Sequence, residues 1–344
     1  MKAPEFWKSG SSSMLPSVLA PLSLLYQLGA NLYRSNTIPG LKTSAPVICI
    51  GNITAGGTGK TPVAIDLGKR IKKIGAKPHF LTRGYGGKTI GPLRVEKCHK
   101  AAEMGDEPLL LSRLADTWCS RNRAEAAKMA VKRGAEVLIM DDGLQHTSLH
   151  KDFSFLVVDG GFGLGNGRLL PAGPLRETLQ AALPRINAVI CLGEDVTNIL
   201  REIPAHIPTL TAVIEAGTAA DGLVPQVEPH KVTKVSYLAF TGIGRPEKFY
   251  ETLIKAGANL ADTVSFPDHH PYTTNEILNL KQKAKQLNAR LITTEKDIVR
   301  LDSKERDDIV SLAMRLRWDD ETALDDVLFK IVKGVDDADS AAGP

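Results

Sequence analysis

The sequence predicts an α/β protein with two domains, the second smaller than the first, and three observations support this. Its 344 residues exceed one average domain and suffice for two, each with its own core. Short apolar runs without polar alternation, separated by helical stretches, are typical of parallel strands covered on both faces. The first of these runs, VICI at Val47, leads into the glycine-rich segment GNITAGGTGKTP. A parallel sheet sandwiched between helices is therefore expected.

The composition excludes several classes of protein. Apolar residues make up 43% and charged residues 24%, which is ordinary for a globular chain and not for a disordered or fibrous one. The formal net charge of +4 is too small for a nucleic-acid footprint, so no nucleic-acid partner is expected. The four cysteines lack C-x-x-C spacing and the eight histidines lack H-E-x-x-H spacing. A reduced compartment is therefore expected, and a zinc or redox site is not.

Residues 1–42 form an apolar N-terminal segment that carries no charge from Ser9 to Tyr33. Pro16, Pro21 and several polar residues interrupt it, so a membrane-spanning helix is not favoured. A secretory signal is rejected because a loop for ATP, a cytosolic nucleotide, follows shortly after. We favour a helix lying in a membrane interface, with a helix docked on the protein's own core as the alternative. The apolar stripe comprises Leu15, Val18, Leu19, Leu22, Leu25, Tyr26, Leu32 and Tyr33, and the basic residues near it are Lys8, Arg34 and Lys42.

Apolar runs divide the rest of the chain into two series. The first lies in residues 43–220, the expected core domain, and contains VICI, HFLT, VLIM, FSFLVV and AVICL. The second lies in residues 221–335, the expected smaller domain, and contains SYLAF, RLITT and IVSLAMRLRW. Residues 216–234 are rich in glycine, proline and polar residues without periodicity, which predicts the connection. Residues 336–344 are expected to form a frayed tail.

The segment TAGGTGKT has the composition of a P-loop. Its glycines let the backbone curl around phosphate oxygens, Lys60 supplies a charge to the β- and γ-phosphates, and the Thr61 hydroxyl can ligate Mg²⁺. A buried strand precedes the segment, and a helix follows whose N-terminus presents free N–H groups. We therefore expect a P-loop NTPase-like parallel sheet sandwich that binds ATP and Mg²⁺, although Thr54 replaces the usual leading glycine. The nucleotide-binding residues would be Thr54, Ala55, Gly56, Gly57, Thr58, Gly59, Lys60 and Thr61.

Acidic residues that could hold the metal follow the strand VLIM. Asp141 and Asp142 come at its carboxyl end, which is the ligand-binding edge of a doubly wound sheet. One Asp capping a helix and one bound to solvent is the alternative. The segment GDEP places Asp106 and Glu107 in a turn, where a plain helix start is the commoner meaning. The segment FPDHHPY holds two histidines in a rigid turn that can aim them, although such a pair is usually structural or solvated.

Together these segments resemble one family, the tetraacyldisaccharide 4′-kinases of lipid A synthesis. The resemblance rests on eight motifs in the same order: GNITAGGTGKTP, TRGYGG, GDEP, DDGLQH, GRLLPAGPLRE, FTGIGRPEKF, FPDHHPY and TTEKD. It implies two α/β domains that close on each other, and transfer of the γ-phosphoryl group of ATP to the 4′-hydroxyl of a tetraacyldisaccharide 1-phosphate. It also implies the cytoplasmic face of the inner membrane of a Gram-negative bacterium. An acylated substrate stays in the bilayer, so the enzyme must reach that lipid surface.

The resemblance further implies roles for single residues. The catalytic positions of the family match Asp106, His269, Arg176 and Arg123, and its metal ligands match Thr61, Asp141 and Asp142. Among these, Asp106 would be the base and His269 its support. Arg121 lies close enough to Arg123 in the sequence to leave the choice of arginine open. Whether Glu107 contacts the metal is a second open point. Weaker matches are Tyr85, Arg83, His146 and His270. The TTEKD segment is assigned no catalytic role.

Two other functions stay open at this point. A P-loop switch or ATPase that drives metal insertion or complex assembly would carry the same loop, hydrolyse ATP slowly and bind a protein. A membrane-bound nucleotide-binding scaffold would tolerate the loss of Asp106. The combination of a base and a histidine argues against both. We therefore expect a monomeric kinase whose partners are an acylated glucosamine disaccharide and the inner-membrane surface.

Overall fold

The computed structural model describes residues 4–10, 12–35, 40–217 and 235–334. Within these residues the strands form one twelve-stranded sheet in the order β10-β9-β11-β12-β8-β7-β6-β1-β5-β2-β4-β3. The strands are β1 (Val47–Gly51), β2 (Pro78–Thr82), β3 (Leu93–Arg94), β4 (Thr117–Cys119), β5 (Val137–Asp141), β6 (Phe153–Asp159), β7 (Ala188–Leu192), β8 (Thr209–Gly217), β9 (Ser236–Thr241), β10 (Asn259–Ser265), β11 (Arg290–Thr294) and β12 (Ile309–Trp318). The α-helices are α1 (Leu15–Ser35), α2 (Lys60–Lys73), α3 (Ala101–Met104), α4 (Asp106–Leu111), α5 (Arg123–Lys132), α6 (Leu179–Ala182), α7 (Pro246–Lys255), α8 (Thr274–Gln286), α9 (Glu295–Ile298) and α10 (Glu321–Lys333).

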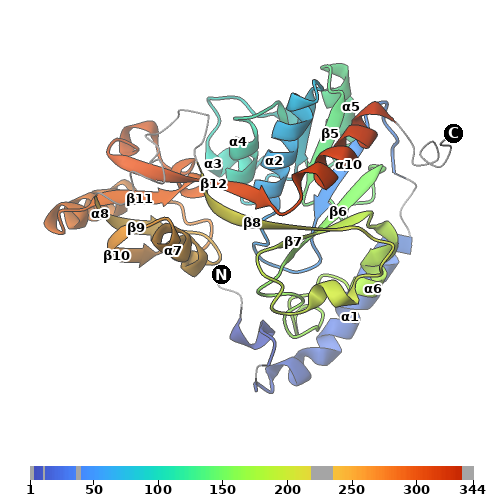
Figure 1. Ribbon diagram of the computed structural model, residues 1–344, viewed down its shortest axis with the longest axis horizontal. Helices are drawn as coiled ribbons and strands as arrows, with labels where there is room; N and C mark the ends of the chain where they lie inside the picture. The colour runs from blue at the N-terminus through green and yellow to red at the C-terminus, as the bar shows by residue number, and fades with distance from the viewer. Residues whose placement is uncertain (1–3, 11, 36–39, 218–234, 335–344) are drawn as a thin grey trace.

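The sheet consists of two parallel sets of strands joined by one antiparallel pair. The first set runs from β4 to β8, with the short β3 antiparallel at its edge. The second set contains β12, β11, β9 and β10. Strand β12 belongs to both, because residues 309–312 pair with β11 and residues 313–318 pair antiparallel with β8. Figure 1 shows β8 and β12 as long strands that connect the two parts.

We call α1, residues 40–217 and residues 313–334 the larger unit, and residues 235–312 the smaller unit. Each predicted apolar run forms a strand, and both units are α/β, so the predicted fold class is confirmed. Sequence reasoning missed β3, β4, β8 and β10. Strand β10 is half exposed and alternates with polar residues, so it lacks the continuous apolar run of a buried strand.

The C-terminal helix α10 packs on the larger unit, although the predicted smaller domain, residues 221–335, included it. Leu324 and Leu328 of α10 are fully buried and join Val63 and Leu67 of α2 in one apolar cluster. The physical reason is the path of β12, which carries the chain back from the smaller unit to the edge of β8. Most of the predicted connection and the predicted tail lie outside the described residues, and the domain limits remain a prediction.

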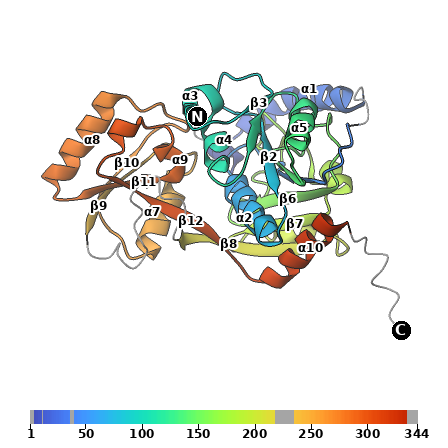
Figure 2. The ribbon, with the colours of Figure 1, turned by 90° about the horizontal axis from the view of Figure 1, so that it is seen from above.

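Helix α1 packs on the larger unit along only one side. Ser23 is buried, its hydroxyl donates to the Leu169 carbonyl at 2.9 Å, and the Ala172 amide donates to it at 3.2 Å. The opposite side exposes Leu15, Val18, Leu22, Leu24, Leu25, Leu28 and Leu32. No helix among the described residues has the length and apolar character needed to cross a membrane. Figure 2 shows α1 and α10 on opposite sides of the larger unit.

Candidate active site

The carboxyl ends of β1, β5 and β6 meet at one edge of the larger unit's sheet. These three strands are parallel neighbours, so the residues that follow them lie close together. The P-loop follows β1 and leads into α2, as predicted. Asp141 ends β5 and Asp142 follows it, while Asp159 ends β6. The predicted nucleotide loop and the predicted acidic residues therefore share this edge.

The backbone of the P-loop requires glycine at two points. Gly56 and Gly59 adopt φ values of 113° and 87°, which side-chain-bearing residues rarely adopt. A Cβ on Gly59 would also lie 2.5 Å from Leu192 Cδ1, so the loop rests closely on β7. The buried Thr58 hydroxyl has no hydrogen-bond partner among the described residues. Such a loop presents free polar groups to a phosphate-bearing ligand.

A second segment lies along the P-loop and positions Arg176. The Ala55 amide donates to the Pro174 carbonyl at 2.7 Å, and the Arg176 amide donates to the Ile53 carbonyl at 2.7 Å. These backbone bonds fix the direction of the Arg176 side chain. Its Nη1 lies 3.1 and 3.2 Å from the two carboxylate oxygens of Asp142. The predicted arginine therefore lies next to the P-loop and the acidic pair.

Asp141 provides oxygen atoms suited to Mg²⁺. The Thr61 hydroxyl donates to Asp141 Oδ2 at 3.4 Å, while Asp141 Oδ1 is buried and has no hydrogen-bond partner among the described residues. Burial and then the charge of Glu107 raise the pKa of Asp141 to about 7. Mg²⁺ prefers oxygen ligands, and in nucleotide sites it usually binds one or two carboxylates together with phosphates. It would therefore give the buried Asp141 oxygen the partner that it lacks. Thr61 and Asp141 therefore fit the predicted metal.

Asp142 has a different environment. Besides Arg176, it faces Lys60, whose Nζ lies 3.6 Å from Asp142 Oδ1. Burial alone would raise its pKa, but the charges of Lys60 and Arg176 outweigh burial and lower the pKa. Its φ of 51° turns the chain sharply after β5 and separates its side chain from that of Asp141. Its predicted role as a metal ligand stays a prediction.

The structure distinguishes the two arginines of the SRNR segment. Arg123 is 3% exposed, and its Nε has no hydrogen-bond partner among the described residues. Burial lowers its pKa to about 10, partly offset by the charges of Asp142 and Asp141. Arg121 is exposed. Arg123 is therefore the arginine whose buried charge lies near the acidic pair.

His146, a weaker candidate, lies behind Arg123. Its Nε2 is 3.3 Å from the Arg123 amide, which donates to it. Burial and then the charge of Arg123 lower its pKa to about 4. The imidazole is therefore neutral near pH 7 and supports the start of α5. Arg83, another weaker candidate, is exposed.

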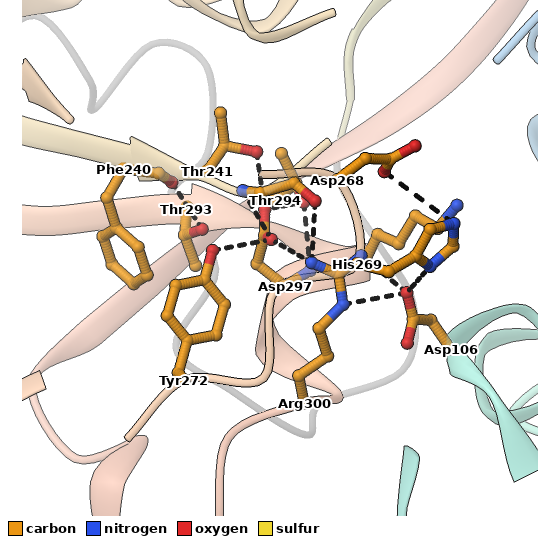
Figure 3. Close-up of polar contacts among 12 residues, drawn as sticks. Asp106, Phe240, Thr241, Asp268, His269, Tyr272, Thr293, Thr294, Asp297 and Arg300 are labelled. Carbon is orange, nitrogen blue, oxygen red and sulfur yellow. Dashed lines mark hydrogen bonds and ion pairs between the residues drawn. The ribbon is translucent and has the colours of Figure 1, made fainter. Parts of the chain in front are cut away.

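Asp106 and His269 come from different units and are in contact, as Figure 3 shows. His269 Nδ1 lies 2.8 Å from Asp106 Oδ2, and His269 has a φ of 58° in its turn. Burial alone would raise the pKa of Asp106, but hydrogen bonds from His269 and Arg300 outweigh it and lower the pKa. The ring of Tyr85 lies 5.3 Å from the His269 ring, between centroids. The other histidine, His270, contacts Glu276 instead, at 3.0 Å.

Sequence reasoning missed two basic residues at this site, Lys296 and Arg300. Arg300 donates to Asp106 Oδ2 from Nε at 2.8 Å and from Nη2 at 2.5 Å. Lys296 Nζ donates to Glu107 Oε1 at 3.1 Å. Both belong to TTEKD and the turn that follows it. The available signal was the TTEKD motif itself, which had no assigned role, together with the acidic pair of GDEP, for which the sequence offered no neighbouring basic residue.

Comparisons with known proteins agree with this geometry. The sequence profile of a family described as tetraacyldisaccharide-1-P 4′-kinase matches residues 15–333. A tetraacyldisaccharide 4′-kinase of Parvibaculum lavamentivorans is 48% identical over 309 residues, which cover 88% of this chain and 87% of the relative. One of Rhodospirillum rubrum is 43% identical over 340 residues, which cover 97% and 99%.

A solved structure also matches over most of the chain. It is the crystal structure of LpxK from Aquifex aeolicus in complex with ATP, with a TM-score of 0.74 and 28% sequence identity. The match covers 93% of this chain and 100% of that one. Sequence profile, relatives and structure thus agree, and this chain belongs to the tetraacyldisaccharide-1-P 4′-kinase family.

Proposed function

We propose that this chain transfers the γ-phosphoryl group of ATP to the 4′-hydroxyl of a tetraacyldisaccharide 1-phosphate, with Asp106 as the base. The kinase activity follows from the family; the assignment of residues is our proposal. The observation that carries it is the 2.8 Å contact between His269 of the smaller unit and Asp106 of the larger unit. This contact supports a carboxylate acceptor for the hydroxyl proton at the junction of the units. A nucleotide-binding loop alone would not need such a group.

ATP is the substrate that the P-loop would hold. Backbone N–H groups around Gly57 would bind the phosphates, and Lys60 would neutralise charge on the β- and γ-phosphates. The Lys60 Nζ lies 3.6 Å from Asp142 Oδ1, so the Asp142 carboxylate holds the lysine at the loop. When ATP binds, a phosphate would replace this carboxylate as the partner of Lys60. We assign the Mg²⁺ to Thr61 and Asp141. When bound, it would neutralise charge on the phosphate oxygens during transfer.

The protein's own groups then perform the remaining steps. Transfer passes through a loose transition state, so catalysis depends on alignment and charge neutralisation. Asp106 would accept the proton of the attacking hydroxyl, and His269 would orient it. Arg123 and Arg176 would supply positive charge near the transferring group. The lowered pKa of Asp106 keeps its carboxylate ionised at neutral pH, so an oxygen is available to accept the proton.

The acylated acceptor would approach from the side of α1. The exposed leucines of α1 form an apolar surface that suits the interface of the bacterial inner membrane, on its cytoplasmic face. A cavity of about 850 Å³ lies between α1 and residues 162–168, and Leu175 and Thr178 also line it. Leu175 is the chain neighbour of Arg176, which supports an acceptor path that leads from the cavity towards the site. We propose that the cavity receives part of the acceptor and that the protein acts as a monomer.

A P-loop switch or ATPase is the alternative function. Such a protein needs a positioned water and a protein partner, and not a carboxylate–histidine pair that spans two units. The Asp106–His269 contact therefore favours a kinase. The two functions differ in their product, which is a phosphorylated lipid in one case and free phosphate in the other.

The experiment is transfer of label from γ-labelled ATP to a tetraacyldisaccharide 1-phosphate in mixed micelles. We expect labelled lipid with the wild-type chain, and a loss of about 10²- to 10⁴-fold in kcat for Asp106→Asn, because a positioned base contributes that much. Asp302→Asn, which removes an exposed ion pair with Lys100, should leave kcat unchanged. Release of free phosphate without labelled lipid would favour the ATPase. An active Asp106→Asn variant would refute the base.

A further inference from the structure

The carboxylate of Asp106 is held asymmetrically. His269 Nδ1 and the Nε and Nη2 atoms of Arg300 all converge on Oδ2, as the dashed lines in Figure 3 show. No described residue makes a hydrogen bond to Oδ1. Asp106 itself is 5% exposed. One oxygen is therefore fixed by the protein, and the other has its acceptor capacity available for a substrate hydroxyl.

The opposite end of the Arg300 guanidinium is fixed as well. Its Nη1 donates to Asp297 Oδ1 and to the Gly242 carbonyl, each at 2.8 Å. The Arg300 side chain is only 3% exposed and that of Asp297 is fully buried. The planar guanidinium therefore connects two carboxylates, one in each unit. Its position allows little rotation, because donors on both edges are engaged.

Asp297 is a hub that fixes this arrangement. It accepts a hydrogen bond from the Tyr272 hydroxyl at 2.8 Å and one from the Gly242 amide at 2.9 Å. The Thr241 hydroxyl donates at 2.6 Å and the Thr294 hydroxyl at 2.5 Å. These donors come from the ends of β9 and β11 and from the turn after β10. A fully partnered buried network of this kind orders its members strongly.

Other charged groups near Asp106 do not replace Arg300. Lys296 is directed to Glu107, at 3.1 Å, and Asp268 lies 3.8 Å from the other nitrogen of His269. Among the described residues, Arg300 is the cation that binds the Asp106 carboxylate with two donors. His269 contributes one.

We infer that Arg300 is a positioning residue for phosphoryl transfer, which acts through Asp106 by fixing Oδ2 and presenting Oδ1 to the acceptor hydroxyl. This inference rests on the proposed role of Asp106 as the base. Arg300 touches no reacting atom. It bonds Asp297 in the smaller unit and Asp106 in the larger unit, so the fixed position of Asp297 also fixes the position of the base.

Two consequences distinguish positioning from mere structural support. Without Arg300, Asp106 loses two hydrogen bonds and a neighbouring positive charge, so its pKa rises towards or above the ordinary value. Because Asp106 must be ionised to accept a proton, the acidic limb of the kcat/KM profile should move to higher pH. The KM for ATP should hardly change, because Arg300 does not contact the P-loop.

The test uses the full chain and the labelled-lipid assay. Arg300→Met is expected to lower kcat at neutral pH by about 10²-fold, the cost of a misplaced catalytic group. Its acidic limb should move up by about 1 to 3 pH units, the usual effect of an opposite charge beside an Asp. Arg300→Lys keeps the charge, so it should return the limb most of the way to the wild-type position while kcat recovers only in part. It also keeps the test valid should the methionine variant not fold.

A double-mutant cycle gives the sharpest result. If Arg300 acts only through Asp106, adding Arg300→Met to Asp106→Asn should lower kcat no further. Asp302→Asn is the matched control, since it removes another contact between the same segment and the larger unit, the 2.8 Å pair with Lys100. Additive losses in the cycle, or an unmoved acidic limb in Arg300→Met, would overturn the inference. A fully active Asp106→Asn variant would instead refute the proposed base, which is a separate outcome.

Discussion

At the scale of residues, the site separates similar side chains by their surroundings. Asp141 and Asp142 are neighbours in the chain, yet the pKa of the first is raised by burial and Glu107, while that of the second is lowered by Lys60 and Arg176. One carboxylate is left for a cation, and the other is already paired with protein cations. The charges and burial around each carboxylate therefore set the role that it can take.

The arginines of the SRNR segment give a direct prediction at this scale. Arg123→Met should lower kcat by about 10²- to 10³-fold, the usual cost of losing one preorganised positive or donor group near the developing charge. Arg121→Met, at an exposed position of the same segment, should remain within about twofold of wild type. The measurement is labelled-lipid formation, with a melting curve to verify folding. Equal losses in both variants would contradict the assignment.

At the scale of elements, α1 has one docked side and one apolar exposed side. Its docked side uses the Ser23 hydroxyl, while Leu22 and Leu25 are 51% and 65% exposed. Because exposed apolar side chains gain free energy when they leave water, a lipid interface would stabilise this side. Docking on the protein's own core, the alternative interpretation, thus describes one side of α1, while a membrane interface for the exposed side stays a prediction.

Changing the exposed side of α1 should weaken binding to lipid without affecting the chemistry. Leu22→Gln with Leu25→Gln should reduce binding to vesicles of phosphatidylethanolamine and phosphatidylglycerol by about 10²-fold or more, since each buried leucine is worth roughly 1.5 to 3 kcal/mol. A co-sedimentation assay measures this. Leu278→Gln, at a leucine of α8 that is 56% exposed, is the control and should bind normally. Unchanged binding of the α1 variant would show that another surface meets the lipid.

At the scale of the whole molecule, polar contacts hold the two units together beside the β8–β12 pair. Asp159, at the end of β6, accepts hydrogen bonds from Arg245 and from Lys248, the latter at 2.6 Å. The Arg245 guanidinium also lies 4.4 Å from the Phe162 ring centroid. Together with the Asp106 contacts, this cluster connects the smaller unit to the ligand-binding edge of the sheet.

Removing the Asp159 charge should loosen the units. Asp159 is 4% exposed, and breaking a buried ion pair on one side costs about 3 to 5 kcal/mol, less where a partner reaches solvent as Lys248 does. Asp159→Asn should therefore lower the melting temperature and broaden the distribution of radii of gyration in small-angle scattering. Asp302→Asn should change neither, because its ion pair with Lys100 is exposed. A compact and equally stable Asp159→Asn variant would show that the β8–β12 pair alone holds the units.

Much of the site could be predicted from contiguous motifs. The P-loop between β1 and α2, the acidic residues after β5 and the contact of Asp106 with His269 all lie where the motifs and the resemblance placed them. The choice between Arg121 and Arg123 could not be made, because both are equally polar in sequence and only their burial differs.

The sequence by itself determined the fold class, the nucleotide loop and the family, because each depends on local patterns: apolar runs, glycines before a helix, and motifs in a constant order. Tertiary structure alone decided which charges meet. Arg300 reaches Asp106 across 194 positions of the chain, and α10 returns to the larger unit through β12. Such contacts depend on how the units pack, and a segment's own composition contains no record of the partner that packing brings to it.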